Sequence, residues 1–450
     1  MLKLTIPAVA AQIINMLYNI VDRIYIGHMS VNGDLALTGV GVCLPIIMII
    51  SAFAALVSMG GAPRASMFMG KGDYKSAQKT LSNCFSLQIV VSAVLTVILL
   101  IWNRPILLAF GASAETIQYA SGYMFIYAIG TVFVQLTLGM NAFITAQGFA
   151  KISMLTVVVG AVANIILDPI FIYGFNMGVE GAALATIISQ AISTAWIIFF
   201  LVGKKTILKL NIKNMIPTPK IILPCLALGL APFIMQASES ILFICFNTSL
   251  YQYGGNIAVG AMTILTSVMQ FTMLPLQGFS QGAQPISSYN FGARNGERVK
   301  KTFYLLLKIC VIYSTVLWAL IMLFPQMFAK MFTPVPELIE YTKWALRIYM
   351  SVSCIMGIQI ACQMTFISIG NATSSIIVAL VRKFATLIPL IYILPQIITN
   401  QVMAVYLAEP IADVIAITFT VCLFAVQFKR ALKKLDMPEK LANLDNPKVV

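Results

Sequence analysis

Charged residues are scarce in this sequence. Only 10% of its 450 residues are charged, against about 25% in an average soluble domain, and 60% are hydrophobic. Histidine occurs once, and the 8 cysteines include no C-x-x-C pair and all lie in apolar segments, as small buried residues do. These shortages exclude a long soluble domain. They also argue against a disulfide framework and against a membrane-embedded enzyme, which would need clustered metal ligands or Asp-rich motifs.

Apolar stretches of 20 or more residues recur from one end of the sequence to the other. Each is long enough to form a transmembrane helix. Together they predict an all-α membrane protein with twelve transmembrane helices in the lipid bilayer. The spans are predicted at residues 4–27, 37–60, 79–102, 118–144, 153–174, 181–203, 222–249, 257–280, 302–324, 341–367, 374–396 and 402–427.

Positive charge is distributed unevenly between the two sides of these spans. Most of the 29 Lys and Arg residues fall on the side of the N-terminus, and the opposite loops hold only Arg104 and Lys330. Because positive charge collects on the cytoplasmic side of membrane proteins, both termini are predicted to be cytoplasmic. The same distribution accounts for the net charge of +14, so no nucleic-acid partner is implied. No cleavable signal peptide is predicted before or within the first span.

The two halves of the sequence nearly repeat each other. The segment GGAPRASMFMG (60–70) aligns with GAQPISSYNFG (282–292), and LDPIFIYG (167–174) echoes LIPLIYIL (387–394). Chance matching is the alternative, since Gly and Pro are common at membrane turns. Six spans per half is an even number, so the halves share one orientation, as in transporters built from parallel repeats.

The repeat predicts two pseudo-symmetric six-helix bundles with a cleft between them, an architecture suited to alternating access. The predicted parts are an N-terminal lobe (1–203), a cytoplasmic linker (204–221), a C-terminal lobe (222–428) and a cytoplasmic tail (429–450).

Four segments carry a family resemblance: YNIVDRIYIG (18–27), NIILDPIFIYG (164–174), LAPFIMQASES (230–240) and QGFSQGAQPISSYNFGARNGERVKK (277–301). They resemble the multidrug and toxic compound extrusion (MATE) transporters. Two further segments, IPLIYILPQ (388–396) and YLAEPIAD (406–413), look like the MepA-like bacterial branch of that family. The resemblance implies a two-lobed monomer in the bacterial inner (plasma) membrane. It also implies export of small cationic hydrophobic molecules in exchange for H⁺ or Na⁺, without a cofactor.

Asp22 and Asp168 stand inside predicted spans, roughly 8–9 Å below the outer surface at 1.5 Å per helical residue. A charged side chain at membrane depth costs roughly 3 kcal/mol or more unless it is neutralised. Asn164 lies one turn before Asp168 on the same face, and Tyr18 and Asn19 lie one turn before Asp22. The pattern predicts a polar pocket in the outer part of the N-terminal lobe.

In the MATE family, residues at the positions of Asp22, Asn164 and Asp168 form the N-lobe cation or proton site. Burial and a neighbouring carboxylate favour the neutral form of a carboxyl group, and oxygen ligands suit a hard ion such as Na⁺. We therefore predict a coupling site for H⁺ or Na⁺ at these residues, together with Tyr18 and Asn19, and no other metal.

Two local explanations of these acids stay open. Asp168 precedes Pro169, and the Asp-Pro pair marks a helix kink because proline removes a hydrogen bond and strains the preceding turn. Asp22 could pair with Arg23, although adjacent helical residues point about 100° apart.

Glu239 lies near the middle of the predicted span 222–249. The resemblance places a C-lobe carboxylate there, which in many Na⁺-coupled relatives works with an acidic residue on the tenth span. Here the tenth predicted span, 341–367, contains no Asp or Glu. We therefore assign Glu239 to substrate binding, together with Gln236 and Asp168.

Glu409 and Asp413 are four residues apart and share a helix face. Arg382 and Lys383 lie in the preceding span. Because intramembrane charges usually pair, we predict an ion pair among Arg382, Glu409 and Asp413. The alternative is that one of the acids faces the cleft.

The charges inside the spans bear on the cargo. Acids outnumber bases there, which favours a cationic substrate. The 24 Met and 27 Phe residues would suit a binding cleft whose walls repack around different ligands, or they would simply face lipid. The alternative function is a flippase of the same superfamily that moves a lipid-linked sugar or another anionic lipid. It would need basic residues along the cleft, of which the sequence has few. The basic motif that follows the second span of major-facilitator transporters is absent.

Overall fold

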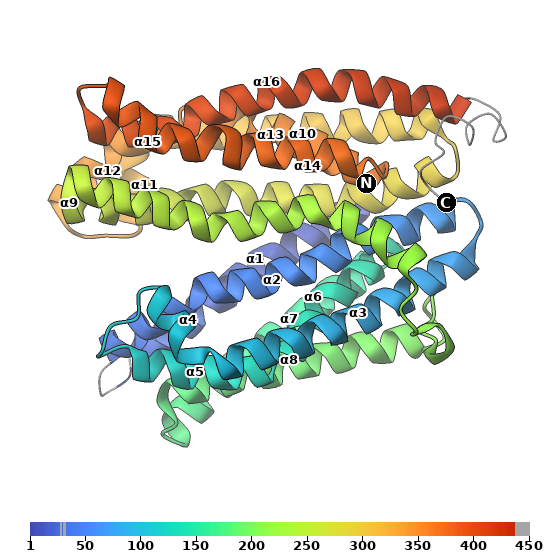
Figure 1. Cartoon of the computed structure of the whole chain (residues 1–450), viewed down its shortest axis with the longest axis horizontal. Helices are drawn as coiled ribbons and strands as arrows, with labels where there is room; N and C mark the ends of the chain where they lie inside the picture. The colour runs from blue at the N-terminus through green and yellow to red at the C-terminus, as the bar shows by residue number, and fades with distance from the viewer. Residues whose placement is uncertain (28, 30–32, 437–450) are drawn as a thin grey trace. The chain divides into compact units, whose positions relative to one another are not determined.

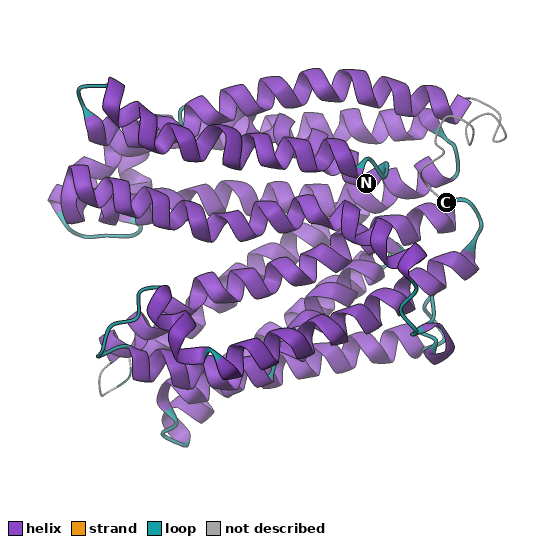
Figure 2. Cartoon of the chain, viewed as in Figure 1, coloured by secondary structure: helices purple, strands orange, loops and turns teal. Residues whose placement is uncertain are grey.

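The chain is built of helices joined by short loops (Figure 2). The computed structural model describes residues 1–27, 29 and 33–436, and no β-strand occurs among them. Helices suit a nearly continuous apolar sequence, because in lipid a helix satisfies its backbone hydrogen bonds internally.

The elements follow one another as numbered in Figure 1. Those of the first half are α1 (Leu2–Gly27), α2 (Gly33–Gly70), α3 (Tyr74–Ile101), α4 (Asn103–Ala109), α5 (Ile117–Ile129), α6 (Thr131–Ala146), α7 (Ala150–Pro169), η1 (Ile170–Gly174), α8 (Gly178–Val202) and η2 (Ile212–Asn214). Those of the second half are α9 (Pro219–Gly292), α10 (Gly296–Leu323), α11 (Pro325–Lys330), α12 (Pro336–Tyr349), η3 (Ser353–Ile355), α13 (Met356–Ser368), α14 (Ala372–Leu380), η4 (Val381–Leu387), α15 (Ile388–Ile397) and α16 (Gln401–Asp436).

Nine helices of the described chain are long and apolar enough to cross a membrane, and two bent pairs raise the number to 11. The pairs are α5 with α6, bent by 57°, and α12 with α13, bent by 49°. The 74-residue α9 is interrupted at Gly255, whose φ of 63° suits a residue without a side chain. Counting α9 as two crossings gives the twelve predicted helices, because the interruption falls between the predicted spans 222–249 and 257–280.

The described residues form two compact units. One comprises Leu2–Gln236, and the other begins at Ala237 and includes Met1. The division falls inside α9, beyond the predicted linker 204–221, because the first turns of α9 pack against α2. Cys225 belongs to the same buried cluster as Val57. The rings of Phe53 and Phe233 meet with centroids 4.9 Å apart.

In the N-terminal unit, α1 lies along α7, α2 packs against α3 and α6, and α8 packs against α5, α6 and α7 (Figure 1). Buried apolar side chains fill the space between these helices in two clusters, one around Tyr123 and one around Phe143. This packing sets α1 beside α7, and these two helices carry Asp22 and Asp168.

In the C-terminal unit, α10 packs against α13, and α16 packs against α12, α13 and α15. The π-helical segment η4 joins α14 to α15 and contacts α16. Tyr406 is fully buried in the core of this unit, and its hydroxyl donates a 2.8 Å hydrogen bond to the carbonyl of Ala258. The packing brings the charged residues of η4 and α16 together.

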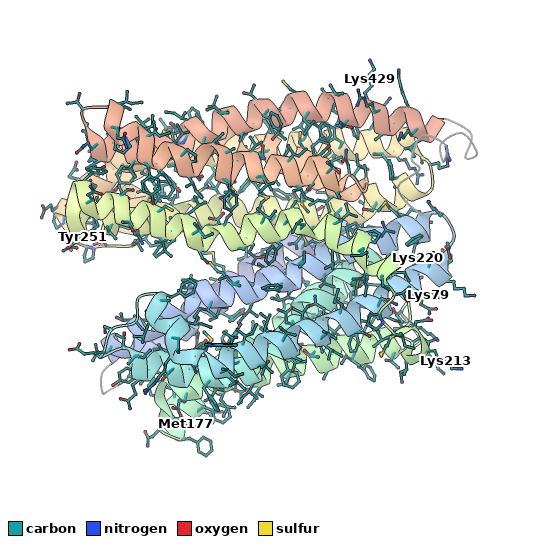
Figure 3. The ribbon with its side chains drawn as sticks, in the orientation of Figure 1. Lys79, Met177, Lys213, Lys220, Tyr251 and Lys429 are labelled. Carbon is teal, nitrogen blue, oxygen red and sulfur yellow. The ribbon has the colours of Figure 1, made fainter. Side chains whose placement is uncertain are left out.

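Basic side chains gather at one end of the N-terminal unit. Figure 3 shows Lys79, Lys213 and Lys220 at this end and Met177 at the opposite end. The basic end is the one that the sequence predicts to face the cytoplasm.

Candidate functional site

Asp168 is buried in the last turn of α7. It is 0% exposed, and Asn164, one turn earlier, is 1% exposed. The amide Nδ2 of Asn164 donates a 3.1 Å hydrogen bond to Oδ1 of Asp168. Helical spacing alone puts the two side chains on one face. A single helix therefore supplies a buried carboxyl group and the amide that holds one of its oxygens.

The helix widens directly after Asp168. Pro169 ends α7, and the next five residues form the π-helical turn η1. Because proline lacks an N–H and crowds the carbonyl four residues earlier, the regular helix cannot continue unchanged, and such wide turns are frequent at functional sites. The hydroxyl of Tyr173, in this turn, donates a 2.7 Å hydrogen bond to the carbonyl of Tyr25. The kink and the buried acid thus occur together, and the kinked end is tied to α1.

Asp22 approaches Asp168 from α1. The two side chains lie within hydrogen-bonding range. Two ionised carboxylates at this range repel each other, so the pair requires a shared proton or a bound cation. The side chains of Asn19 and Arg23 lie outside the described part of the structure, so the predicted role of Asn19 and the alternative Asp22–Arg23 pair stay untested.

Two tyrosines on α5 belong to the surroundings of Asp22, although the sequence does not predict them as site residues. Tyr123 and Tyr127 are each 4% exposed, and their rings stack with centroids 6.1 Å apart. Tyr123 interacts electrostatically with Asp22 and with Tyr18, and Tyr127 interacts electrostatically with Tyr18. The motif YMFIY, which puts both rings on one helix face, is the sequence signal that could have revealed them.

Two oxygens of this acidic group are available to an ion. Oδ1 of Asn164 and Oδ2 of Asp168 are buried, and neither accepts a hydrogen bond from an N–H or hydroxyl group of the described chain. A proton shared with Asp22 would satisfy Oδ2, and a small cation would satisfy both atoms. The all-oxygen set of Asp22, Asn164 and Asp168 fits a proton or a hard ion such as Na⁺.

A second group of buried charges lies in the C-terminal unit. Nε of Arg382 donates to Oδ1 of Asp413 at 2.9 Å, and Nη2 donates to Oε1 of Glu409 at 3.3 Å. These are the three residues for which the sequence predicts an ion pair, and their side chains are 4–6% exposed. Buried carboxylates without a counter-ion would be costly, so one arginine holds both in place.

Lys383, the neighbour of Arg382, faces a different acid. Its Nζ lies 2.7 Å from Oε1 of Glu239 on α9. The Lys383 side chain is 2% exposed, whereas that of Glu239 is 53% exposed. The sequence predicts no basic partner for Glu239, because no local pattern relates two positions 144 residues apart.

The predicted substrate residues belong to different units. Gln236 ends the N-terminal unit, half-buried, and Glu239 stands just inside the C-terminal unit. Asp168 belongs to the N-terminal unit. The assignment of these three residues to one substrate site stays a prediction.

A family model described as MatE matches residues 7–170 and 232–393 of the chain. Among curated proteins, the multidrug export protein MepA of Staphylococcus haemolyticus (strain JCSC1435) is 26% identical over 430 residues, covering 95% of this chain and 92% of that protein. The protein of the same name from Staphylococcus aureus (strain MSSA476) is 24% identical over 418 residues, covering 92% of each.

Solved structures resemble the chain over nearly its whole length. The structure of the MATE multidrug transporter DinF-BH in complex with rhodamine 6G is 34% identical, has a TM-score of 0.87, and covers 94% of each chain. An outward-facing multidrug resistance MATE family transporter of the MOP superfamily is 24% identical with a TM-score of 0.90, and covers 96% of this chain and 95% of that one. These likenesses confirm the predicted all-α membrane fold.

Proposed function

Because the chain belongs to the MATE family of membrane transporters, we propose that it is a secondary-active exporter that exchanges cationic amphipathic compounds for H⁺ or Na⁺. It is a transporter and not an enzyme. The observation that carries the proposal is the group of Asp22, Asn164 and Asp168, in which Asn164 and Asp168 are buried. Acids inside a membrane are costly and are typical of ion and proton pathways.

The nature of the cargo has separate support. The Staphylococcus relatives are named multidrug export proteins, and DinF-BH is described with rhodamine 6G bound. Among the described residues of the C-terminal unit, the acids Glu239, Glu409 and Asp413 pair with two bases, Arg382 and Lys383. The excess negative charge favours a cation over the anionic lipid that a flippase would carry.

The proposed cycle couples two competing binding events. From outside, H⁺ or Na⁺ binds at Asp22 and Asp168, and drug affinity falls, so drug leaves outward. After the units rearrange, the ion leaves to the cytoplasm and drug binds from inside or from the inner leaflet. Ion and drug must each weaken the other's binding by the same factor. Asn164 would hold Oδ1 of Asp168 in place while Oδ2 takes and releases the ion.

We propose that the exporter works as a monomer in the bacterial plasma membrane with both termini in the cytoplasm. The cluster of Lys79, Lys213 and Lys220 at one end of the N-terminal unit supports this orientation (Figure 3).

Efflux of ethidium from preloaded cells tests the proposal. Cells that express the chain should lose ethidium faster than cells with an empty vector, and Asp168→Asn should abolish the difference at equal expression. Glu115→Gln removes an acid that lies outside the helices and should leave efflux unchanged. Efflux that survives Asp168→Asn would show that this acid has only a structural role, at the helix kink before Pro169. No efflux from a well-expressed wild type would favour a narrower cargo or a lipid-linked one.

A further inference from the structure

Lys383 occupies the place that an incoming cation would take on Glu239. Its ammonium group lies 2.7 Å from one carboxylate oxygen, the distance of a charge-assisted hydrogen bond. An organic ammonium or an alkali ion would be held by the same oxygen. In the described part of the chain, Glu239 is the single ion-pair partner of Lys383.

The two side chains of this pair face different surroundings. Lys383 is enclosed at 2% exposure and reaches Glu239 from within the C-terminal unit. Glu239 keeps 53% of its side chain exposed, so a mobile ligand can approach the carboxylate from the other side. A cation that arrives there meets an acid whose charge is already compensated.

Lys383 also has an alternative place to go. Arg382 is shared between Glu409 and Asp413, so a single positive charge serves two carboxyl groups. Lys383 also interacts electrostatically with Glu409. A lysine is a compact charge on a flexible stem, whereas the planar fork of arginine is fixed by its two partners. Displaced from Glu239, the Lys383 ammonium can turn toward Glu409 without losing all of its compensation.

We propose that Lys383 is an internal competitor of the cationic cargo: the cargo binds Glu239 by displacing the Lys383 ammonium, which sets the affinity for cations. The inference rests on the proposed function and deepens it by naming a residue that determines affinity. It also implies that Glu239 needs no coupling ion in the empty transporter, which leaves the coupling ion to Asp22 and Asp168.

Equilibrium binding of rhodamine 6G to the purified full-length protein, measured by fluorescence anisotropy, tests the inference. Lys383→Met keeps the length of the side chain and removes its charge. It should tighten binding by about tenfold, which corresponds to about 1.4 kcal/mol. In the double variant Glu239→Gln with Lys383→Met, the gain should disappear. A lysine with a merely structural role would weaken binding when removed, so the direction of the change separates the two roles.

A matched control is available on the surface. Lys301 pairs with Glu297 at the same 2.7 Å, but both side chains are more than three-quarters exposed. Lys301→Met should leave rhodamine 6G affinity unchanged. The double variant also removes both charges of the Glu239–Lys383 pair, so a monodisperse double variant shows that the site folds without them.

The outcomes separate this inference from the exporter itself. Wild-type and Lys383→Met proteins that bind equally well, or a Lys383→Met protein that binds more weakly, would overturn the competition and leave the exporter standing. If neither protein binds an organic cation, the exporter proposal fails and the competition fails with it. A gain in affinity that persists in the double variant would show that Glu239 is not the site of competition.

Discussion

At the scale of single residues, the buried charged side chains of this protein find charged partners on other helices. Asp168 obtains one partner, Asn164, from its own helix and another, Asp22, from α1. Arg382 and Lys383 are adjacent in sequence, yet they bind acids on two different helices, α16 and α9. The tertiary fold therefore supplies the opposite charge for both of these basic side chains. A substitution that removes one charge leaves its partner unpaired in an apolar interior.

Asn164→Ala removes the amide that holds Asp168. We expect it to cost about 1–3 kcal/mol of stability and to reduce drug efflux more than stability alone explains, because Oδ1 of Asp168 loses its donor. Efflux and thermal unfolding of the purified variant measure the two effects. Asn141→Ala is the control, since it removes an amide donor to the carbonyl of Ser153, at 3.2 Å, and touches no acid. Equal loss of efflux in both variants would deny Asn164 a role in coupling.

The parts of this site that follow from helical spacing could be predicted from the sequence. Asn164 and Asp168, four residues apart, were predicted to share a face, as were Glu409 and Asp413. The pairing of Glu239 with Lys383 and the presence of Tyr123 depend on which helices become neighbours. Which helices become neighbours depends on long-range packing, and a single sequence contains no direct signal for it.

At the scale of elements, corresponding helices of the two halves begin with the same kind of side-chain N-cap. The side chain of Asp73 accepts a 3.0 Å hydrogen bond from the backbone of Ser76 at the start of α3. The side chain of Asn295 accepts a 3.0 Å hydrogen bond from the backbone of Arg298 at the start of α10. The two caps are separated by the same 222 positions as the repeated segments 60–70 and 282–292. They differ in that only the aspartate titrates.

This difference predicts unequal responses to pH. Hydrogen bonds from the side chain and backbone of Ser76 hold the pKa of Asp73 below its usual range. The ionised cap therefore contributes stability above the pKa of an unfolded Asp, about 4, and loses it as the pH falls through the lower folded value. Asp73→Ala should cost about 1 kcal/mol at neutral pH, with the cost shrinking in acid. Asn295→Ala should cost a similar amount at both pH values.

Thermal unfolding in detergent at neutral and acidic pH measures both variants. A cost of Asp73→Ala that stays constant with pH would show that the charge of the cap contributes nothing.

Close contact between α2 and the start of α9 depends on glycine. A Cβ atom at Gly60 would overlap the carbonyl oxygen of Cys225, and one at Gly229 would overlap that of Leu56. Small residues at helix interfaces allow such approach in membrane proteins. Gly60→Ala should lower the free energy of unfolding by about 3 kcal/mol, since backbone must move. Gly41→Ala, on the same helix with nothing within 4 Å, should be neutral or slightly stabilising. Equal melting temperatures of the two variants would contradict this packing.

The helices themselves could be predicted from apolar run length, but their irregularities could not. The sequence predicts the spans 118–144 and 341–367 as single helices, and the structure bends both. It places a π-helical turn beside Pro169 and another just before Pro389. Proline signals that a helix is disturbed, whereas the packing of neighbouring helices decides whether the result is a bend, a wide turn or an interruption.

At the scale of the whole molecule, the chain combines a family fold with a predicted orientation in the membrane. The family and fold are shown by the match over residues 7–170 and 232–393. The orientation rests on the charge of the loops. Lys213→Cys and Arg104→Cys, each made in a chain whose 8 native cysteines are replaced by serine, test it with a membrane-impermeant maleimide. In intact cells only the cysteine at 104 should react, and in inside-out vesicles only the one at 213. The opposite pattern would invert the topology and the direction of transport.

The central claim is that an ion gradient drives drug across the membrane through Asp168. The most direct measurement is rhodamine 6G transport by the purified protein in proteoliposomes, with a pH gradient or a Na⁺ gradient imposed separately. We predict that one of the two gradients drives transport by the wild type and that neither drives transport by Asp168→Asn. Gradient-driven transport that persists in Asp168→Asn, or wild-type transport that ignores both gradients, would contradict the account.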